Sequence, residues 1–168
     1  KNGRYWQGGI WPGTNYMVMT GLANKGYKKQ AREIALNHYK QILEVYKNTG
    51  TFWEYYSPES AEPGFMARKD FVGWTGLPPI AGLIEFVIGI RGDYTKKQIV
   101  WDMNLTEVNG IERYPFGPEG MITLKAKERK SVNDEPEITI DSNIPFELLV
   151  HYGDKEKTIK VTPDKKNY

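Results

Sequence analysis

The sequence predicts an α+β protein, with helices in its first half and strands in its second half. Two observations support this prediction. Apolar residues recur at helical spacings of three and four up to about residue 90, and then at every second position. The change falls in RGDYTKK at 91–97. We therefore expect a helical domain over 1–92 and a small antiparallel β domain, of the sandwich type, over 93–168.

The first two predicted helices form a hairpin. Pro12 suits an early helical position, Thr14 suits a cap, and Gly26 suits the end of the first helix. The segment 27–49 has the clearest helical pattern and ends at Gly50. Its apolar face comprises Ala31, Ile34, Ala35, His38, Ile42, Val45 and Tyr46.

A third helix is expected over 76–90, after a long loop over 51–75. The segment 76–90 is apolar nearly all round, so we expect it to be buried. In the second half, alternation predicts five short strands, and GDKE at 153–156 predicts a hairpin turn between the last two. The strands are expected around 99–103, 122–126, 138–140, 148–152 and 159–161.

Composition excludes several classes of function. The chain has no Cys, which excludes disulfides, zinc–thiolate sites and thiol nucleophiles. Its 23 basic and 21 acidic residues are mixed, so no nucleic-acid partner is expected. The longest apolar run, 80–90, is too short to span a bilayer and contains Glu85, so no membrane partner is expected. The two His are isolated and no nucleotide fingerprint is present, so we expect neither a metal nor a cofactor.

The stretch TFWEYYSPES at 51–60 places Glu54 among four aromatic residues. Burial of an unpaired carboxylate costs several kcal/mol or more, whereas a solvated loop has no need of so many aromatics. A sugar-binding cleft uses both. Two other aromatic segments, 4–16 and 70–76, stand at predicted helix entrances. Loops at one end of stacked hairpins lie together, so we expect the three segments to meet.

The candidate site therefore combines a base with aromatic and polar side chains. Glu54 is the candidate general base. The candidate substrate-binding residues are Trp6, Gln7, Trp11, Asn15, Trp53, Trp74 and Thr75. An ordinary structural role remains open for each: a Trp often packs in a core, a lone Glu is often simply hydrogen-bonded, and His38 suits a satisfied core histidine. A non-catalytic carbohydrate-binding or structural module is the alternative to an enzyme.

Three motifs together resemble a known group of enzymes. YWQGGIWPGTNY, WEYYSPE and FVGWTGLPPIAGLIEFVIGI are similar to the C-terminal end of the catalytic domain in trehalase-like glycosidases. These are glycoside hydrolase families 37 and 63, including mannosylglycerate-hydrolase-like enzymes. The resemblance covers about residues 4–92. Gln7 stands where trehalases have Asp, and PESAEPGFMARKD replaces their glycine-rich stretch, which favours the family 63 side.

The resemblance implies the C-terminal helical hairpins of an (α/α)6 barrel, also called a six-hairpin glycosidase fold. It implies an inverting mechanism on α-linked sugars, with Glu54 as general base and an upstream Asp, outside this chain, as general acid. The substrate would be an oligosaccharide or a small glycoside. We expect the chain to be a fragment that is inactive alone, from a soluble protein of the bacterial cytoplasm or periplasm.

Overall fold

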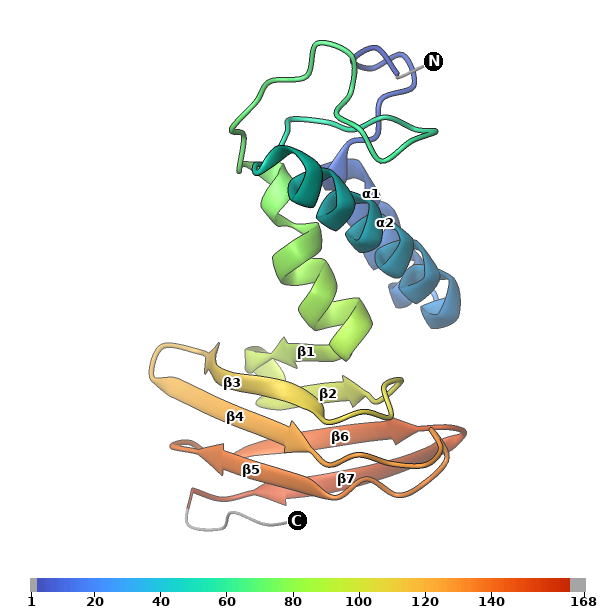
Figure 1. The fold of residues 1–168 in the computed structure, drawn as a ribbon. Coiled ribbons are helices and arrows are strands. Elements are labelled where there is room, and N and C mark those ends of the chain that lie inside the picture. The colour runs from blue at the N-terminus through green and yellow to red at the C-terminus, as the bar shows by residue number, and fades with distance from the viewer. Residues whose placement is uncertain (1–2, 164–168) are drawn as a thin grey trace. The chain divides into compact units, whose positions relative to one another are not determined.

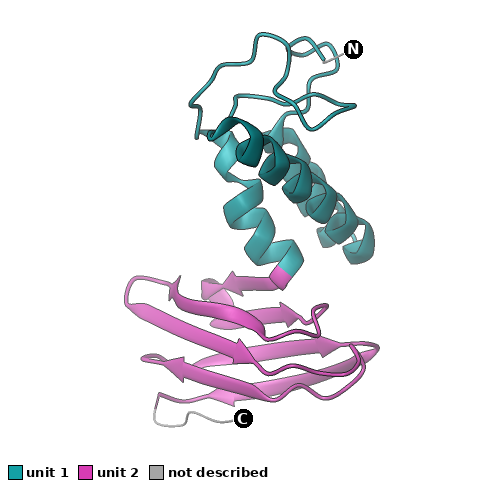
Figure 2. Ribbon diagram, in the orientation of Figure 1, with its two compact units in different colours: residues 1–87 teal, residues 88–168 magenta. Residues whose placement is uncertain are grey.

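The computed structural model describes residues 3–163, which form two compact units (Figure 2). The units comprise residues 1–87 and 88–168, and each is described by itself below. The first contains helices and long loops and the second contains strands, so the predicted α+β class is confirmed. The assignment of 1–92 to a partial barrel domain and 93–168 to a separate domain stays a prediction.

Helices α1 (Pro12–Asn24) and α2 (Lys28–Thr49) lie side by side as a hairpin (Figure 1). Gly26 has φ 87° in the link, a backbone conformation that suits glycine. The predicted Thr14 cap is wrong. The helix begins directly after Trp11, and the Thr14 hydroxyl donates to the Trp11 carbonyl oxygen at 2.8 Å from inside the first turn. Pro12, as expected, occupies the first helical position.

The inner face of α2 follows the predicted pattern with one exception. Its buried residues are Ala31, Ala35, His38, Ile42 and Val45. Tyr46 is exposed, and its ring packs against Phe52 with 4.9 Å between ring centroids. Gly50 ends the helix in the left-handed conformation and donates its N–H to the Tyr46 carbonyl at 2.7 Å.

The third helical segment comprises η1 (Trp74–Gly76) and η2 (Pro78–Ile88). η2 is wound as a π-helix, and the Gly82 N–H donates to the Leu77 carbonyl five residues back at 2.8 Å. Phe86 and Val87 of η2 pack with Met19, Ala31 and Ala35 in one apolar core. The expectation that this helix is buried all round is wrong for the chain as it stands, because Ile80 is 62% exposed.

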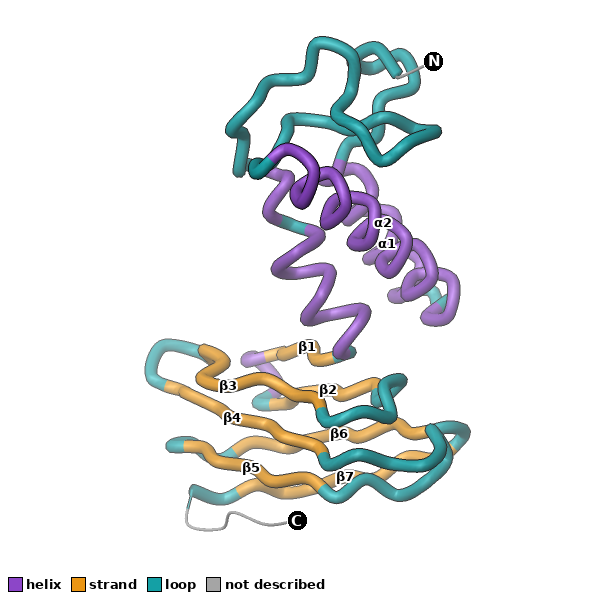
Figure 3. The backbone as a smooth tube through the Cα atoms, in the orientation of Figure 1, coloured by secondary structure: helices purple, strands orange, loops and turns teal. Residues whose placement is uncertain are grey.

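The described part of the second unit, up to residue 163, has seven strands in two sheets (Figure 3). One sheet has the order β1-β2-β6-β7 and the other β3-β4-β5. The strands are β1 (Ile90–Asp93), β2 (Gln98–Asp102), β3 (Asn109–Phe116), β4 (Gly120–Ala126), β5 (Ile138–Ser142), β6 (Phe146–Tyr152) and β7 (Lys155–Val161). A short turn of helix, η3 (Tyr94–Lys96), joins β1 to β2.

This unit corrects the expected β domain in two ways. It is not wholly antiparallel, because β2 and β6 run parallel with Ile99 beside Leu148. It also has two strands that the pattern missed. β1 has only four residues, and the register of β3 shifts between Ile111 and Tyr114, which breaks its alternation. The predicted hairpin is confirmed: Tyr152 pairs with Lys155 across a two-residue turn.

The core of the second unit comes from alternate residues, as the period of two predicts. In β4, Ile122, Leu124 and Ala126 are buried, while Met121 and Lys125 are exposed. The two sheets pack on each other: the Phe116 ring of β3 meets the Phe146 ring of β6 with 6.1 Å between centroids. Two packed sheets are the arrangement expected of a sandwich.

Among the described residues, no helix combines the length and apolarity needed to cross a bilayer.

A substitution at Gly89 tests the packing of the second unit. Gly89 has φ 92°, and a Cβ added there would overlap the carbonyl oxygen of Asp102. Gly89→Ala is therefore expected to lower the free energy of unfolding by about 2 kcal/mol. Gly21→Ala is the control, because Gly21 lies inside α1 with open space around it, and should raise that free energy by about 0.5–1 kcal/mol. Equal effects of the two changes in denaturant melts would contradict this account.

His38 predicts a specific pH dependence of stability. Burial lowers its pKa from 6.5 to about 4. The unfolded chain therefore binds the proton first as the pH falls, so the stabilisation is complete above pH 6.5 and is lost towards pH 4. The loss attributable to His38 is about 3 kcal/mol, at about 1.4 kcal/mol per pH unit.

The measurement compares unfolding free energies of the wild type and His38→Gln from pH 7 to pH 4. In the variant, the free energy of unfolding should fall less steeply with decreasing pH, because the contribution of His38 is absent. Asp93 does not overlap with it: hydrogen bonds from Lys96 and Thr95 lower its pKa from 3.8 to about 2, so its contribution disappears only below that window. Parallel losses in both proteins would show that His38 is not the titrating group.

Candidate functional site

Two loops form the candidate site, one before α1 and one after α2. Main-chain hydrogen bonds join them. The Ile10 N–H donates to the Tyr56 carbonyl at 2.9 Å, and the Tyr56 N–H donates to the Ile10 carbonyl at 3.0 Å. The Phe65 N–H also donates to the Gly3 carbonyl at 3.1 Å. Segments far apart in the sequence therefore lie together at one end of the hairpin (Figure 1).

The aromatic cluster consists of stacked and tilted rings from these loops. Trp6 stacks on Trp11 with centroids 4.0 Å apart, and Trp11 stacks on Tyr55 at 4.9 Å. Trp11 also lies 5.7 Å from Trp74, centroid to centroid. Trp11 is 5% exposed but Trp6 is 64% exposed, so the stack runs from the core to the surface. The full cluster is Tyr5, Trp6, Trp11, Tyr55, Phe71 and Trp74.

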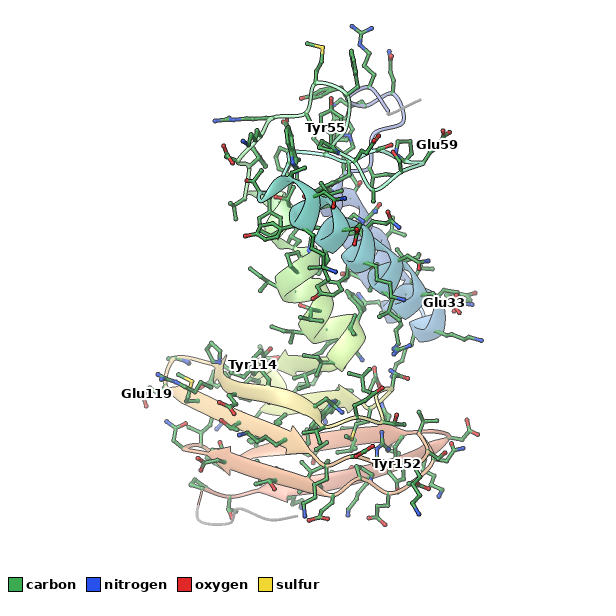
Figure 4. All side chains as sticks on the ribbon, viewed as in Figure 1. Glu33, Tyr55, Glu59, Tyr114, Glu119 and Tyr152 are labelled. Carbon is green, nitrogen blue, oxygen red and sulfur yellow. The ribbon has the colours of Figure 1, made fainter. Side chains whose placement is uncertain are left out.

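Tyr55, in the loop after α2 (Figure 4), packs on Tyr5 and Trp11, although the sequence analysis did not select it. Its hydroxyl donates to the Phe65 carbonyl at 2.5 Å, and its side chain is buried. A Cβ at Gly9 or Gly64 would collide with the Tyr55 ring, so both positions need glycine. The sequence signal that was available is its place beside Glu54.

Glu54 is held by its main chain rather than by its side chain. Its N–H donates to the Arg68 carbonyl at 2.9 Å, and its carbonyl accepts from the Trp74 indole N–H at 2.8 Å. The residue is half-buried. Within residues 3–163, its carboxylate makes no hydrogen bond or ion pair that could neutralise it. The structure thus fixes the position of Glu54 and leaves its carboxylate available.

The structure does not bring two of the predicted residues to the surface of the cluster. The Trp53 indole donates to the Thr49 hydroxyl at 3.0 Å, and its ring packs on the core formed by Ile42, Val45 and Tyr56. Thr75 is fully buried, and its hydroxyl donates to the Phe71 carbonyl. Both side chains therefore stabilise the loop through internal contacts.

The two predicted amides lie in different surroundings. Gln7 is exposed next to Trp6, and its main chain pairs with Arg4. Asn15 is half-buried in α1, where its Nδ2 lies 3.2 Å from Nδ1 of His38. His38 is buried as expected but not fully satisfied, because its Nε2 has no hydrogen-bond partner in the described part of the chain.

The same loops hold strained backbone. Three non-glycine residues in the first unit have positive φ: Tyr5 at 51°, Met66 at 62° and Asp70 at 56°. All three lie in the two loops that form the cluster. Such strain persists only where surrounding contacts impose it, and it concentrates at functional sites. No cluster of three or more potential metal ligands occurs within residues 3–163.

Trp74→Phe tests whether the indole bond fixes Glu54. Phe keeps an aromatic ring but loses the N–H, so the Glu54 amide should exchange with solvent about fivefold faster or more. Trp53→Phe is the matched control. Trp53 is the residue before Glu54, and the change removes its indole hydrogen bond to Thr49 rather than a bond to Glu54. Amide hydrogen exchange at Glu54, followed by NMR, should separate the two variants. Equal acceleration in both would contradict a specific role for Trp74.

Parts of the chain are similar to known proteins. Residues 1–75 match the family model of the mannosylglycerate hydrolase MGH1-like glycoside hydrolase domain. An uncharacterized protein of Borreliella burgdorferi is 27% identical, and the match covers 96% of this chain and 36% of that protein. The probable mannosyl-oligosaccharide glucosidase of Schizosaccharomyces pombe is 31% identical, over 44% of this chain and 10% of its own length.

Mannosylglycerate hydrolase MGH1 of Selaginella moellendorffii is 35% identical, over 49% of this chain and 15% of its own length. No solved structure matches the chain. The chain thus spans about a third of the first relative and much less of the others. The matched residues include every predicted site residue, and the resemblance of residues 1–75 to MGH1-like glycoside hydrolase domains is confirmed.

Proposed function

We propose that the intact protein is a glycoside hydrolase acting on α-linked sugars, and that this chain supplies its general base and part of its sugar pocket. One observation supports this most directly. Glu54 is half-buried and its carboxylate is unpaired among the described residues, while hydrogen bonds on both sides fix its main chain beside the aromatic cluster. The family match over 1–75 and the names of the relatives support the same reaction class.

The proposed reaction is inverting. Two carboxyl groups about 6.5–9.5 Å apart stand on opposite faces of the glycosidic bond. Glu54, ionised, removes a proton from a water molecule, whose oxygen attacks the anomeric carbon. A carboxylic acid on the other side gives its proton to the leaving oxygen. We assign that acid to an Asp in another segment of the intact protein, upstream of this chain. No cofactor is needed.

The sugar would lie against the exposed part of the aromatic cluster. Trp6 turns one face to Trp11 and is 64% exposed, so it offers an apolar surface to the C–H groups of a sugar ring. Gln7 is exposed beside it and could bond to hydroxyls. The substrate would be an oligosaccharide or a small glycoside.

We also propose that α1, α2 and η2 belong to an (α/α)6 barrel. Met17 and Val18 of α1 are 71% and 53% exposed, and Ile80 of η2 is 62% exposed. Large exposed apolar side chains on adjacent helices usually mark a surface that another element covers. Further helices of the intact protein would cover them.

Glu54→Gln tests the proposed base in the intact protein. Gln has nearly the shape of Glu but cannot take a proton from water. The turnover number should fall by about 10²–10⁴-fold, while sugar binding stays close to that of the wild type. Azide attacks without a general base, so it should restore turnover and give a glycosyl azide of inverted configuration. Steady-state kinetics, binding titration and product analysis measure these effects.

Glu33→Gln is the control, because Glu33 is an exposed glutamate on α2, distant in sequence from the loops (Figure 4). It should retain wild-type turnover. A Glu54→Gln protein with near-normal kcat would remove Glu54 from the mechanism. If the wild type binds sugar but hydrolyses no glycoside, the chain is part of a non-catalytic carbohydrate-binding module. The 168-residue chain alone should show no hydrolysis.

A further inference from the structure

A separate cavity lies beside α2, on residues that the proposed mechanism does not use. Its volume is about 360 Å³, within the range of about 300–1,000 Å³ typical of small-molecule sites. The inner face of α2 forms one wall, and residues 56–60 form another. Neither Glu54 nor any Trp lines it. Asn15 is the one predicted substrate-binding residue that does.

The charge of the cavity excludes anionic ligands. None of the described residues that line it is Lys or Arg. His38 is neutral at physiological pH, because burial lowers its pKa to about 4. Glu59, at the tip of its loop, is the single acidic residue of the lining (Figure 4). The described residues of the lining therefore offer no cation to a phosphate, sulfate or carboxylate.

The polar groups of the cavity suit hydroxyls. Asn37 and Gln41 are four residues apart on α2, so their amides project from one face of the helix. Each amide offers both donors and an acceptor. Ser57 and Ser60 add hydroxyl groups on the loop side. Ile10, Ile42 and Val45 provide apolar parts of the lining.

Hydrogen bonds hold two of the lining residues in place. The amide nitrogen of Asn15 can only donate, so Nδ1 of neutral His38 must accept, and the ring hydrogen lies on Nε2. That Nε2 is buried and has no partner within residues 3–163, so we do not count it among the groups open to a ligand. Tyr56 is held by its two main-chain bonds to Ile10.

We propose that this cavity binds a neutral sugar residue, as a subsite separate from the surface around Glu54. The argument against an anionic ligand follows from the described lining residues alone. The choice of a sugar among neutral ligands rests on the proposed function. In the intact enzyme such a subsite would hold a part of the substrate, or of a second carbohydrate, that does not react.

The test is an NMR titration of the intact protein in a Glu54→Gln background, which prevents turnover of the probe. Methyl α-D-glucopyranoside is the probe, and glucose 6-phosphate is its charged counterpart. The side-chain amide signals of Asn37 and Gln41 are assigned by their loss in Asn37→Ala and Gln41→Ala. Asn48 is the matched control, because it is an exposed Asn on the same helix that does not line the cavity.

Saturable shifts of the Asn37 and Gln41 amides, without a shift of Asn48, are expected. In Asn37→Ala, the Gln41 signal should report a dissociation constant about tenfold higher or more, because hydrogen bonds to the sugar are lost. Glucose 6-phosphate should bind more weakly than the methyl glycoside. Both substituted residues are exposed, and thermal melts confirm that the variants fold.

Unshifted Asn37 and Gln41 signals, or equal shifts at Asn48, would overturn the proposed subsite. Equal or tighter binding of glucose 6-phosphate would overturn the argument from charge. The two proposals fail separately. If the wild type hydrolyses glycosides but the Glu54→Gln protein shows no shifts, only the proposed subsite is contradicted. If the Glu54→Gln protein shows the shifts but the wild type hydrolyses no glycoside, the proposed subsite stands and the proposed activity is contradicted.

Discussion

The paired main-chain bonds between Ile10 and Tyr56 join the two loops that form the candidate site in the first unit. They are only two hydrogen bonds, of 2.9 and 3.0 Å, but they join the loop that leads into α1 to the loop that follows α2. Together with the bond from the Phe65 N–H to the Gly3 carbonyl, this connection brings Trp6 and Trp11 near Tyr55. Because each bond satisfies a backbone group that would otherwise be buried unpaired, the connection also makes the burial of Tyr56 possible.

Two adjacent tyrosines at this junction pack in different surroundings. Tyr55 stacks on Trp11 in the aromatic cluster, while Tyr56 packs on Ile42 and Val45 and lines the cavity. Glu54 precedes both. Two adjacent tyrosines, both buried, therefore belong to different environments. The same short segment of backbone contributes to both the cluster and the cavity.

Local patterns were sufficient to predict most of the helices and strands. The helix over 27–49 and the strands around Leu124 and Val150 have regular periods, because each buries one face against a neighbouring element. β1 and β3 have no such regularity, since one is four residues long and the other changes register. The parallel pairing of β2 with β6 depends on residues some fifty positions apart, and no local pattern encodes it.

The sequence indicated candidate residues whose types are unusual in their setting, and their role in a site stays a prediction. Glu54 among aromatics is such a case, and so are the exposed Trp6 and the buried Trp11. Trp53 has the same type and the same neighbours in sequence, yet its indole bonds to Thr49 on the other side of the loop. Tyr55 and His38 gain their roles from partners distant in sequence, Trp11 and Asn15. Only the folded structure shows those partners.

Glu54 differs from other carboxylates of the chain in the way it is held. In the second unit, a hydrogen bond and the charge of Lys125 lower the pKa of Glu112, and Lys157 does the same for Glu135. A carboxylate paired in this way holds protons less readily, and its lone pairs are occupied. Glu54 has its main chain anchored by Arg68 and Trp74, and no such pairing at its side chain among the described residues. Anchoring a residue through its peptide group fixes the point from which its side chain extends, without occupying the oxygen atoms that a general base must offer to water.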